Sequence, residues 1–336
     1  MTKRALVSVC IPAYSNPELL ERLLKSILAQ SYRPIEINVV DDCSPIDLSE
    51  ICKQFSKEDE NEISLKYFRN RTNLGTYLNL FECIGKASGE YLLQIDHDDW
   101  LFDDRFIEEA VNLFQSNMSL SLVIGNSQLE DTNRLSLRLD FGDKFMSLKG
   151  ESFLRKHLYS DLHPARSGVI MNYTKLKSSK YSEAFLPKST IERYQVHPDE
   201  AFGLLSILAT LGDVEVSSRV VSVRGNPPNS FSKSEFWSES APMGLVFSFD
   251  KLASYFFTKR NVTGFIVSLR NAIILYPVRC KDLFQLRFLS FPFRIKVVSI
   301  LNFIFQLITS FPKRCLHSAM YRSRIVKEFL SKMVAR

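Results

Sequence analysis

The sequence lacks the cysteine patterns of extracellular and zinc-binding proteins. Its 336 residues include six cysteines, and no two of them form a C-x-x-C pair. Scattered cysteines argue against a disulfide framework and against a structural zinc site. We therefore expect a reducing, cytoplasmic compartment, in which Cys10 and Cys83 are small buried residues.

Long hydrophobic runs, repeats and low-complexity tracts are also missing. The first apolar run stops at Pro12, which makes it too short for a secretory signal, so we expect it to be the first strand. The uncharged stretch Val297–Pro312 is shorter than the ~20 residues that a membrane-spanning helix needs. Nothing matches a nucleic-acid-binding module, so nucleic acid is not an expected partner.

Charge is distributed unevenly along a chain of otherwise ordinary globular composition. Hydrophobic residues make up 45% and charged residues 24%, and the net charge is +6. Residues 250–336 carry 16 Lys and Arg against 3 Asp and Glu, whereas residues 1–249 carry 27 against 34. This split predicts a basic appendage that faces an anionic partner.

Apolar periodicity predicts alternating strands and helices. Strands are expected over residues 6–11, 35–40, 63–68 and 91–95, with helices over 18–30, 48–57 and 76–86 between them. The alternation predicts an α/β fold with a mostly parallel sheet flanked by helices. Farther along we expect helices over 102–114 and 201–211, strands over 121–126, 167–172 and 214–224, and a mobile loop over 225–240. We divide the chain into a domain over residues 1–240 and a basic helical region over residues 241–336.

Three carboxylates follow the predicted strand 91–95. Asp96 and Asp98 are spaced to reach one cation from the edge of the sheet. Mg²⁺ and Mn²⁺ prefer oxygen ligands and need few from the protein when a phosphate supplies the rest. A solvated acidic turn would explain this motif alone, but other polar residues follow the ends of two more strands: Tyr14, Asn16, Asp41 and Asp42. Because ligands bind beyond the carboxyl ends of parallel strands, the convergence favours a site for a metal-bound nucleotide diphosphate.

Five short segments occur in a characteristic order: Val7-Ser-Val-Cys-Ile-Pro-Ala-Tyr14, Ser26-Ile-Leu-Ala-Gln-Ser-Tyr32, Val39-Val-Asp-Asp-Cys-Ser44, Ala87-Ser-Gly-Glu-Tyr91 and Ile95-Asp-His-Asp-Asp-Trp-Leu101. Together they resemble inverting family 2 glycosyltransferases with the GT-A fold, of the bacterial cell-surface polysaccharide type. The resemblance covers residues 5–230. It implies Mn²⁺- or Mg²⁺-dependent transfer of a sugar from a UDP- or GDP-sugar to a saccharide or lipid-linked saccharide.

The resemblance also implies roles for individual residues. The loop that holds the nucleotide base corresponds to Pro12, Ala13 and Tyr14. Asp42 corresponds to the carboxylate that accepts a hydrogen bond from the base. Asp98 is implied as the direct metal ligand and Asp96 as the ligand nearer the ribose, whereas Asp99 is expected to turn or cap the next segment.

Inverting transfer also needs a general base, which must lie across the sugar from the diphosphate and so come from another segment. Asp199 precedes the predicted helix 201–211. With Phe202 it matches the family's pattern of an acidic residue followed three positions later by an aromatic or apolar residue. Glu200 is the alternative base. A helix N-terminus favours an ionised carboxylate, although the same position also suits a simple helix cap.

The chain departs from the family in the helix 76–86, which lacks the arginine of the family's Ala-Arg-Asn motif. Arg69, Arg71 and Arg224 are therefore the candidates to contact the diphosphate in its place, since arginine pairs well with phosphate oxygens. Arg224 opens a loop that either closes over the donor or leaves this arginine solvated.

The basic segment 285–336 has two interpretations. It forms either an interfacial helix on anionic lipid or an amphipathic helix packed on the catalytic domain. We expect the protein to be cytoplasmic, either free or peripheral on the inner face of the plasma membrane.

Two other functions remain open on the sequence. One is a non-catalytic, membrane-associated GT-A-like binding module. The other is a sugar-1-phosphate nucleotidyltransferase, which would need a glycine-rich basic loop where this chain has Pro12-Ala-Tyr-Ser-Asn-Pro17.

Overall fold

The computed structural model describes residues 4–56, 62–137, 140–159, 164–196, 198, 200–228, 230, 233 and 235–261. The chain divides into two compact units. One is built from Met1–Phe185 with Asp199–Ser234, and the other from Leu186–Pro198 with Glu235–Arg336. The first unit contains the sheet and the candidate catalytic, nucleotide-binding and metal-binding residues.

The second unit contains α7 (Lys188–Tyr194) and α9 (Glu235–Thr258), which meet through Tyr194 and Phe247 with ring centroids 5.2 Å apart. Because α9 begins at Glu235, the loop expected over 225–240 is shorter than predicted. The boundary after residue 240 stays a prediction, and the basic segment 285–336 lies outside the described residues. Within the described part of the chain, no helix has the length and apolar character that crossing a bilayer requires.

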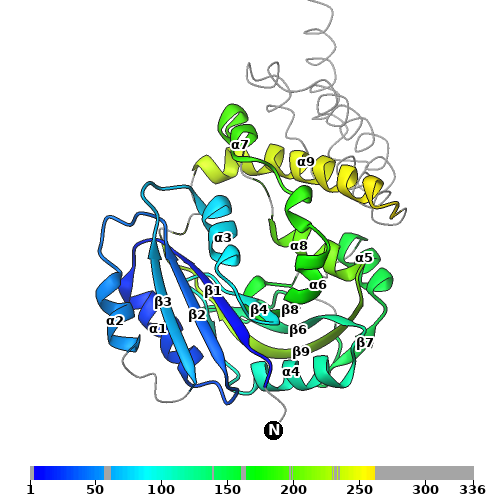
Figure 1. Cartoon of the computed structure of the whole chain (residues 1–336), viewed down its shortest axis with the longest axis horizontal. Coiled ribbons are helices and arrows are strands. Elements are labelled where there is room, and N and C mark those ends of the chain that lie inside the picture. The colour runs from blue at the N-terminus through cyan, green and yellow to red at the C-terminus, as the bar shows by residue number, and fades with distance from the viewer. Residues whose placement is uncertain are drawn as a thin grey trace, which may run out of the picture. The chain divides into compact units, whose positions relative to one another are not determined.

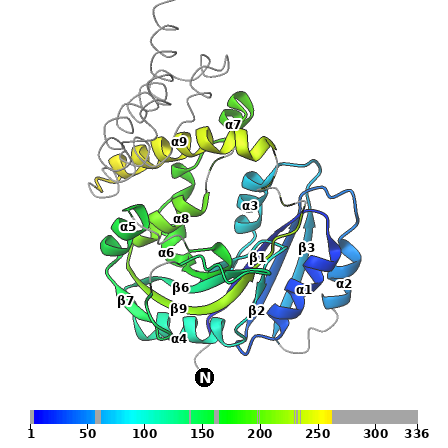
Figure 2. The ribbon, with the colours of Figure 1, turned by 180° about the vertical axis from the view of Figure 1, so that it is seen from behind.

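Four parallel strands form the N-terminal half of the sheet, as the alternating pattern predicts. Their order is β3-β2-β1-β4. α1 and α2 lie on one side of these strands and α3 on the opposite side (Figure 1; Figure 2). The elements are β1 (Val7–Ala13), α1 (Pro17–Leu28), β2 (Ile35–Asp41), α2 (Ser49–Ser56), β3 (Ile63–Arg69), α3 (Thr76–Gly85) and β4 (Tyr91–Gln94).

The second half of the sheet mixes strand directions. Among the described residues the sheet has nine strands in the order β3-β2-β1-β4-β8-β6-β9-β5, with β7 beside β9. β8 runs antiparallel to β4 and to β6, whereas β9 runs parallel to β6. The remaining elements of this unit are β5 (Trp100–Leu101), α4 (Phe106–Ser116), β6 (Leu120–Leu129), β7 (Met146–Leu148), α5 (Gly150–Tyr159), β8 (Val169–Asn172), α6 (Tyr173–Ser178), α8 (Glu200–Ala209) and β9 (Asp213–Arg224).

The helix expected over 102–114 begins later than predicted, at Phe106. Trp100 and Leu101 pair with β9 as a short strand, and the N–H groups of Phe102 and Asp103 then donate to the Val221 carbonyl of β9 at 2.9 and 3.2 Å. This pairing holds the segment after the acidic turn against the second half of the sheet.

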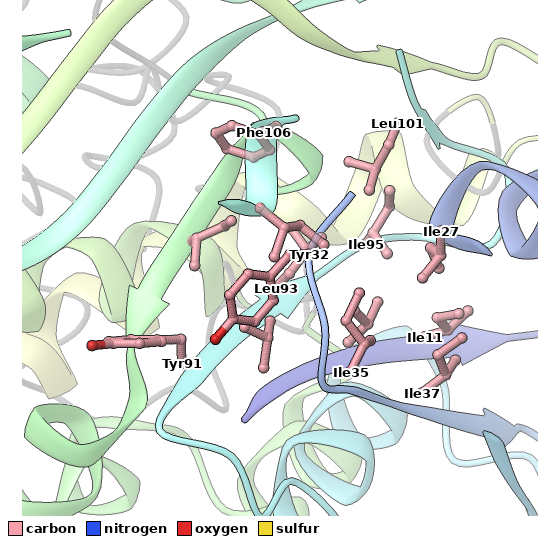
Figure 3. Close-up of a cluster of buried hydrophobic side chains, with 14 of the residues drawn as sticks. Ile11, Ile27, Tyr32, Ile35, Ile37, Tyr91, Leu93, Ile95, Leu101 and Phe106 are labelled. Carbon is pink, nitrogen blue, oxygen red and sulfur yellow. The ribbon is translucent and has the colours of Figure 1, made fainter. Parts of the chain in front are cut away.

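The apolar face of β1 forms the main core with α1. Its alternate residues Val7, Val9 and Ile11 are fully buried. From α1 come residues spaced along one helical face: Leu20, Leu23, Leu24 and Ile27. Figure 3 shows Ile11 and Ile27 in this cluster, with side chains from β2, β4 and α4. Full burial of one such side chain contributes about 1.5–3 kcal/mol, so this face fixes how α1 lies on the sheet.

The other face of the sheet carries a buried carboxylate, Glu36. It accepts hydrogen bonds from the Ser8 hydroxyl at 2.5 Å, from the Ser88 N–H at 2.5 Å and from the Ser88 hydroxyl at 2.8 Å. Burial by itself raises the pKa of Glu36, but these bonds and the Lys66 ammonium 3.8 Å away outweigh burial. The pKa of Glu36 therefore lies below its usual value, and the carboxylate ties the turn before β4 to β1 and β2.

Replacing this carboxylate tests its charge state. Glu36→Gln is expected to lower the free energy of unfolding by about 1–3 kcal/mol at pH 7, because a neutral amide replaces a charged acceptor. The pKa of Glu36 is lower in the folded state than in the unfolded state. The ionised carboxylate therefore stabilises the fold above the unfolded-state pKa of about 4.3, and this stabilisation is lost as the pH falls through the folded-state pKa. Urea unfolding of both proteins should show that their difference in free energy of unfolding becomes smaller from pH 7 to pH 3. A difference that stays constant would contradict an ionised Glu36. The control is Glu50→Gln, because Glu50 is exposed.

Candidate active site

The carboxyl ends of β1, β2 and β4 meet at one edge of the sheet, as expected for parallel strands. Ala13 lies beside Asp41 in register, and the Asp42 N–H donates to the Ala13 carbonyl at 2.9 Å. On the other side of β1, Cys10 pairs with Gln94, and Ile95 N–H donates to the Cys10 carbonyl at 3.1 Å. The Asp41–Asp42 pair and the acidic turn therefore flank the same end of β1.

Asp41 is fully buried and holds the end of β2 to β3. Its Oδ1 accepts from the Ser44 N–H at 2.9 Å and from the Ser44 hydroxyl, while its Oδ2 accepts from Tyr67 at 2.6 Å and from Arg69 at 2.5 Å. Arg69 also donates to the Ser44 carbonyl at 2.7 Å. We therefore no longer expect Arg69 to contact a diphosphate, since its guanidinium is committed to this structural cluster.

Asp42 shapes the loop between β3 and α3. Its Oδ1 accepts from the Asn70 side chain at 2.9 Å and from the Leu74 N–H at 2.8 Å, and its Oδ2 accepts from the Gly75 N–H at 2.8 Å. Gly75 has φ 81, a conformation that glycine adopts without strain. The carboxylate is thus held rigidly beside β1, as a group that recognises a ligand must be.

The loop after β1 lies next to Asp42. Ala13 is buried, Pro12 is half-buried and Tyr14 is 45% exposed, so the Tyr14 ring is accessible to a ligand. Ser15 N–H donates to the Ser44 hydroxyl at 2.8 Å, which links the loops that follow β1 and β2. The structure thus brings the base-binding loop implied by the sequence alongside Asp42.

The acidic turn after β4 is closed by a hydrogen bond from the Asp99 N–H to the Asp96 carbonyl at 3.0 Å. Asp96 Oδ1 accepts from the Gln94 side chain at 3.0 Å, and its Oδ2 accepts from Arg166 at 2.7 Å. Arg166 opens the 3-10 helix Arg166–Gly168, which precedes β8. Sequence reasoning missed this arginine, because only the antiparallel pairing of β8 with β4 brings it to the acidic turn.

Burial and neighbouring negative charge raise the pKa values of Asp98 and Asp99. Burial, followed by the charge of Asp96, raises the pKa of Asp98. Burial, followed by the charges of Asp96 and Asp98, raises the pKa of Asp99 to about 8, and the Arg224 charge partly opposes this shift. A divalent cation at the turn would favour the ionised forms, so the electrostatics of the turn suit cation binding.

The donor set also suits such a cation. Among the described residues, no group of three or more His, Cys, Asp and Glu side chains is arranged to hold a metal ion. Mg²⁺ characteristically uses one or two carboxylates and takes its other ligands from substrate phosphates and water. Asp98 and Asp96 fit that pattern, and they are the residues that would hold Mg²⁺ or Mn²⁺.

Asp99 anchors the loop that follows β9. It accepts a hydrogen bond from the Gly225 N–H at 3.0 Å and is 7% exposed. Its expected role in turning or capping the next segment stays a prediction. Arg224, at the start of that loop, is exposed and close enough for its charge to act on Asp99. The predicted role of Arg224 in diphosphate binding stays a prediction.

Arg22 of α1 fastens the acidic turn to its surroundings. It donates to Glu130 at 2.7 Å and to the Asp98 carbonyl at 3.0 Å, and its guanidinium lies 3.7 Å from the centre of the Trp100 ring. Glu130 also accepts from the Asn226 N–H at 3.2 Å. This network holds the turn and the loop after β9 together, and it was not foreseen because its members are far apart along the chain.

Gly225 leaves no room for a side chain. A Cβ built there would lie 2.1 Å from the Asp98 carbonyl oxygen. Gly225→Ala is expected to displace the acidic turn, lowering the free energy of unfolding by about 1–3 kcal/mol and weakening Mn²⁺ binding. Thermal unfolding and Mn²⁺ titration measure the two effects. The control is Gly85→Ala in α3, where nothing lies within 4 Å of the new methyl; equal behaviour of the two variants would contradict the close contact.

The N-terminus of α8 carries the predicted base. Asp199 lies outside the described residues, and α8 begins with Glu200. Gly203, in the first turn, packs so closely on Phe185 that a Cβ would lie 2.7 Å from its ring, and Phe185 contacts Phe81 of α3 with centroids 4.7 Å apart. The first turn of α8 is therefore fixed to α3. The choice of Asp199 or Glu200 as base stays a prediction.

Comparison with known proteins identifies the family and the fold. Residues 8–173 match the family model described as Glycosyl transferase family 2. The GalNAc(5)-diNAcBac-PP-undecaprenol beta-1,3-glucosyltransferase of Campylobacter jejuni is 30% identical over 131 residues, which cover 39% of this chain and 40% of that protein. The chain spans less than half the length of the first curated relatives that it matches.

Two solved structures share the fold. S. aureus TarS 1–349 in complex with UDP-GlcNAc has a TM-score of 0.55 at 17% identity, over 90% of this chain and 92% of that chain. The mannosyltransferase PcManGT from Pyrobaculum calidifontis in complex with GDP-Man and Mn²⁺ has a TM-score of 0.52 at 14% identity, over 93% and 89%. On the family model, residues 8–173 form a glycosyl transferase family 2 domain, and the shared fold is the GT-A fold.

Proposed function

We propose that the chain transfers a sugar from a nucleotide-sugar donor to a hydroxyl acceptor, with inversion at the anomeric carbon and with a divalent cation. The observation that carries the proposal is the position of Asp42 and of the acidic turn on either side of the carboxyl end of β1. A nucleotide across that end would meet Asp42 with its base and the acidic turn with its diphosphate. The UDP-GlcNAc and GDP-Man of the two similar structures support a donor of this class.

Asp42 is the proposed acceptor for an N–H of the base. Its carboxylate has about four acceptor positions, and the side chain of Asn70 and the backbone of Leu74 and Gly75 use three of them. One position is left for a donor such as a base N–H. The exposed Tyr14 ring, with Pro12 and Ala13, would cover the base.

Asp98, with Asp96, is the proposed binding site for Mn²⁺ or Mg²⁺. The cation would supply the positive charge that neutralises the leaving nucleoside diphosphate. Arg224 is the proposed second source of positive charge, because it is exposed at the start of the loop held by Asp99. The Mn²⁺ present with the Pyrobaculum mannosyltransferase is consistent with this assignment.

Asp199 is the proposed base that takes the proton from the acceptor hydroxyl, with Glu200 as the alternative. A carboxylate at the start of α8 would be kept ionised by the helix N-terminus. The packing of Gly203 on Phe185 would keep that helix end in a constant position while the acceptor reacts.

The proposed acceptor is a saccharide or lipid-linked saccharide of cell-surface glycan synthesis. The name of the Campylobacter relative contains a diphosphate-linked undecaprenol saccharide, which supports an acceptor of this class. The basic segment 285–336 would then bring the protein to the anionic inner face of the plasma membrane.

Donor hydrolysis tests this function. The full-length protein is incubated with a panel of UDP- and GDP-sugars and Mn²⁺, and release of nucleoside diphosphate is measured with and without a chelator. Chelator-sensitive release from one donor is the expected result. Binding of a nucleotide-sugar without cleavage, in the presence of a range of saccharide acceptors, would instead favour a non-catalytic binding module.

A further inference from the structure

Arg166 forms an ion pair with a carboxylate of the acidic turn. Its Nη2 lies 2.7 Å from Asp96 Oδ2, and the two side chains are 29% and 32% exposed. A partly solvated ion pair of this kind contributes little to stability, so it can be exchanged for another partner at small cost.

The backbone beneath Arg166 is held firmly. Ser167 is fully buried and its hydroxyl accepts from the Ser222 hydroxyl at 3.2 Å. A Cβ on Gly168 would lie 2.8 Å from the Gly125 carbonyl oxygen, so this backbone sits directly against β6. A partly exposed arginine on a fixed backbone can change partner through rotation of its side chain.

Asp96 has both carboxylate oxygens in use, because Gln94 donates to Oδ1 and Arg166 donates to Oδ2. A divalent cation that binds Asp96 at Oδ2 would repel the guanidinium and take its place. The displaced guanidinium would remain beside the diphosphate that accompanies the cation. Its planar fork suits phosphate oxygens.

We propose that Arg166 neutralises Asp96 in the free protein and transfers to the donor diphosphate when the metal-bound nucleotide enters. This inference rests on the proposed function, since it assumes a metal-bound nucleotide at the acidic turn. It assigns to Arg166 the diphosphate contact that α3 lacks, and it makes the site bind metal and nucleotide together in preference to metal alone.

The proposal predicts effects of opposite sign for one substitution. Arg166→Met removes the competitor for Asp96, so Mn²⁺ alone is expected to bind about tenfold more tightly. The same change removes a charged hydrogen-bond donor from the diphosphate, so a nucleoside diphosphate with Mn²⁺ is expected to bind at least about tenfold more weakly. A simple loss of structure would weaken both.

Two binding measurements on the full chain test this. Free Mn²⁺ is followed by electron paramagnetic resonance, and UDP and GDP binding at saturating Mn²⁺ is followed by calorimetry. Arg166→Lys should keep the weak Mn²⁺ binding of the natural protein but lose part of the nucleotide affinity. The control is Arg105→Met. Arg105 is exposed, and the carbonyl of the preceding residue, Asp104, accepts from the Ser31 N–H, which follows the C-terminus of α1.

The binding results separate failure of the Arg166 role from failure of the proposed function. Weaker binding of both ligands, or no change in either, would overturn the role of Arg166 while leaving nucleotide-sugar transfer intact. Failure of the natural protein to bind any nucleoside diphosphate with Mn²⁺ would overturn the proposed function and this inference together. Thermal unfolding of each variant shows whether it is folded.

Discussion

Asp98→Asn is expected to lower the rate of sugar transfer by about 10³-fold. The proposed cation stabilises the leaving diphosphate by several kcal/mol, and each 1.36 kcal/mol changes the rate tenfold. Asparagine keeps the size of the side chain but loses the charge that a hard cation needs. Because burial and the charge of Asp96 both disfavour the ionised form of Asp98, replacing its charge with a neutral amide should not destabilise the fold.

The measurement for Asp98 combines turnover with Mn²⁺ dependence. The variant should require a much higher Mn²⁺ concentration for half-maximal activity, and its melting temperature should equal or exceed that of the natural protein. Asp131→Asn is the matched control, because Asp131 is exposed and its φ of 59 is accepted by asparagine. Unchanged Mn²⁺ dependence in Asp98→Asn would remove Asp98 from the metal site.

Asp199→Asn is expected to lower turnover by about 10²–10⁴-fold while leaving donor affinity nearly constant. The loss is that of a general base, which contributes a factor of this size. Donor affinity should persist, because the proposed donor contacts come from Asp42 and the acidic turn, which belong to other segments of the chain.

Turnover and donor binding must be measured separately for this variant, with Glu200→Gln as its partner. If Asp199 is the base, Glu200→Gln keeps most of the activity. The reverse pattern would assign the base to Glu200. Near-normal turnover in both variants would exclude the start of α8 as the source of the base.

The parallel half of the sheet was predictable because its signals are local. The strands from β1 to β4 are short and rich in apolar residues, and each helix between them shows a helical apolar period. The carboxylates Asp42, Asp96 and Asp98 follow strand ends directly. Parallel pairing is therefore enough to bring them to one edge.

The rest of the site depends on contacts that no local pattern reveals. Arg166 reaches Asp96 because β8 runs antiparallel to β4, and Glu130 reaches Arg22 and Asn226 across more than 90 residues of sequence. The division of labour between Asp41 and Asp42 also needs the structure. The register of β2 and β3 commits Asp41 to Arg69, which leaves Asp42 as the carboxylate available to a ligand.

The most direct test of the central claim is a crystal structure of the full chain with its cognate nucleoside diphosphate and Mn²⁺. Anomalous scattering locates the Mn²⁺ ion independently of the protein coordinates. The account predicts Mn²⁺ bound by the Asp98 carboxylate and the diphosphate, with the base hydrogen-bonded to Asp42. A nucleotide bound away from the carboxyl end of β1, or Mn²⁺ bound without Asp98, would contradict it.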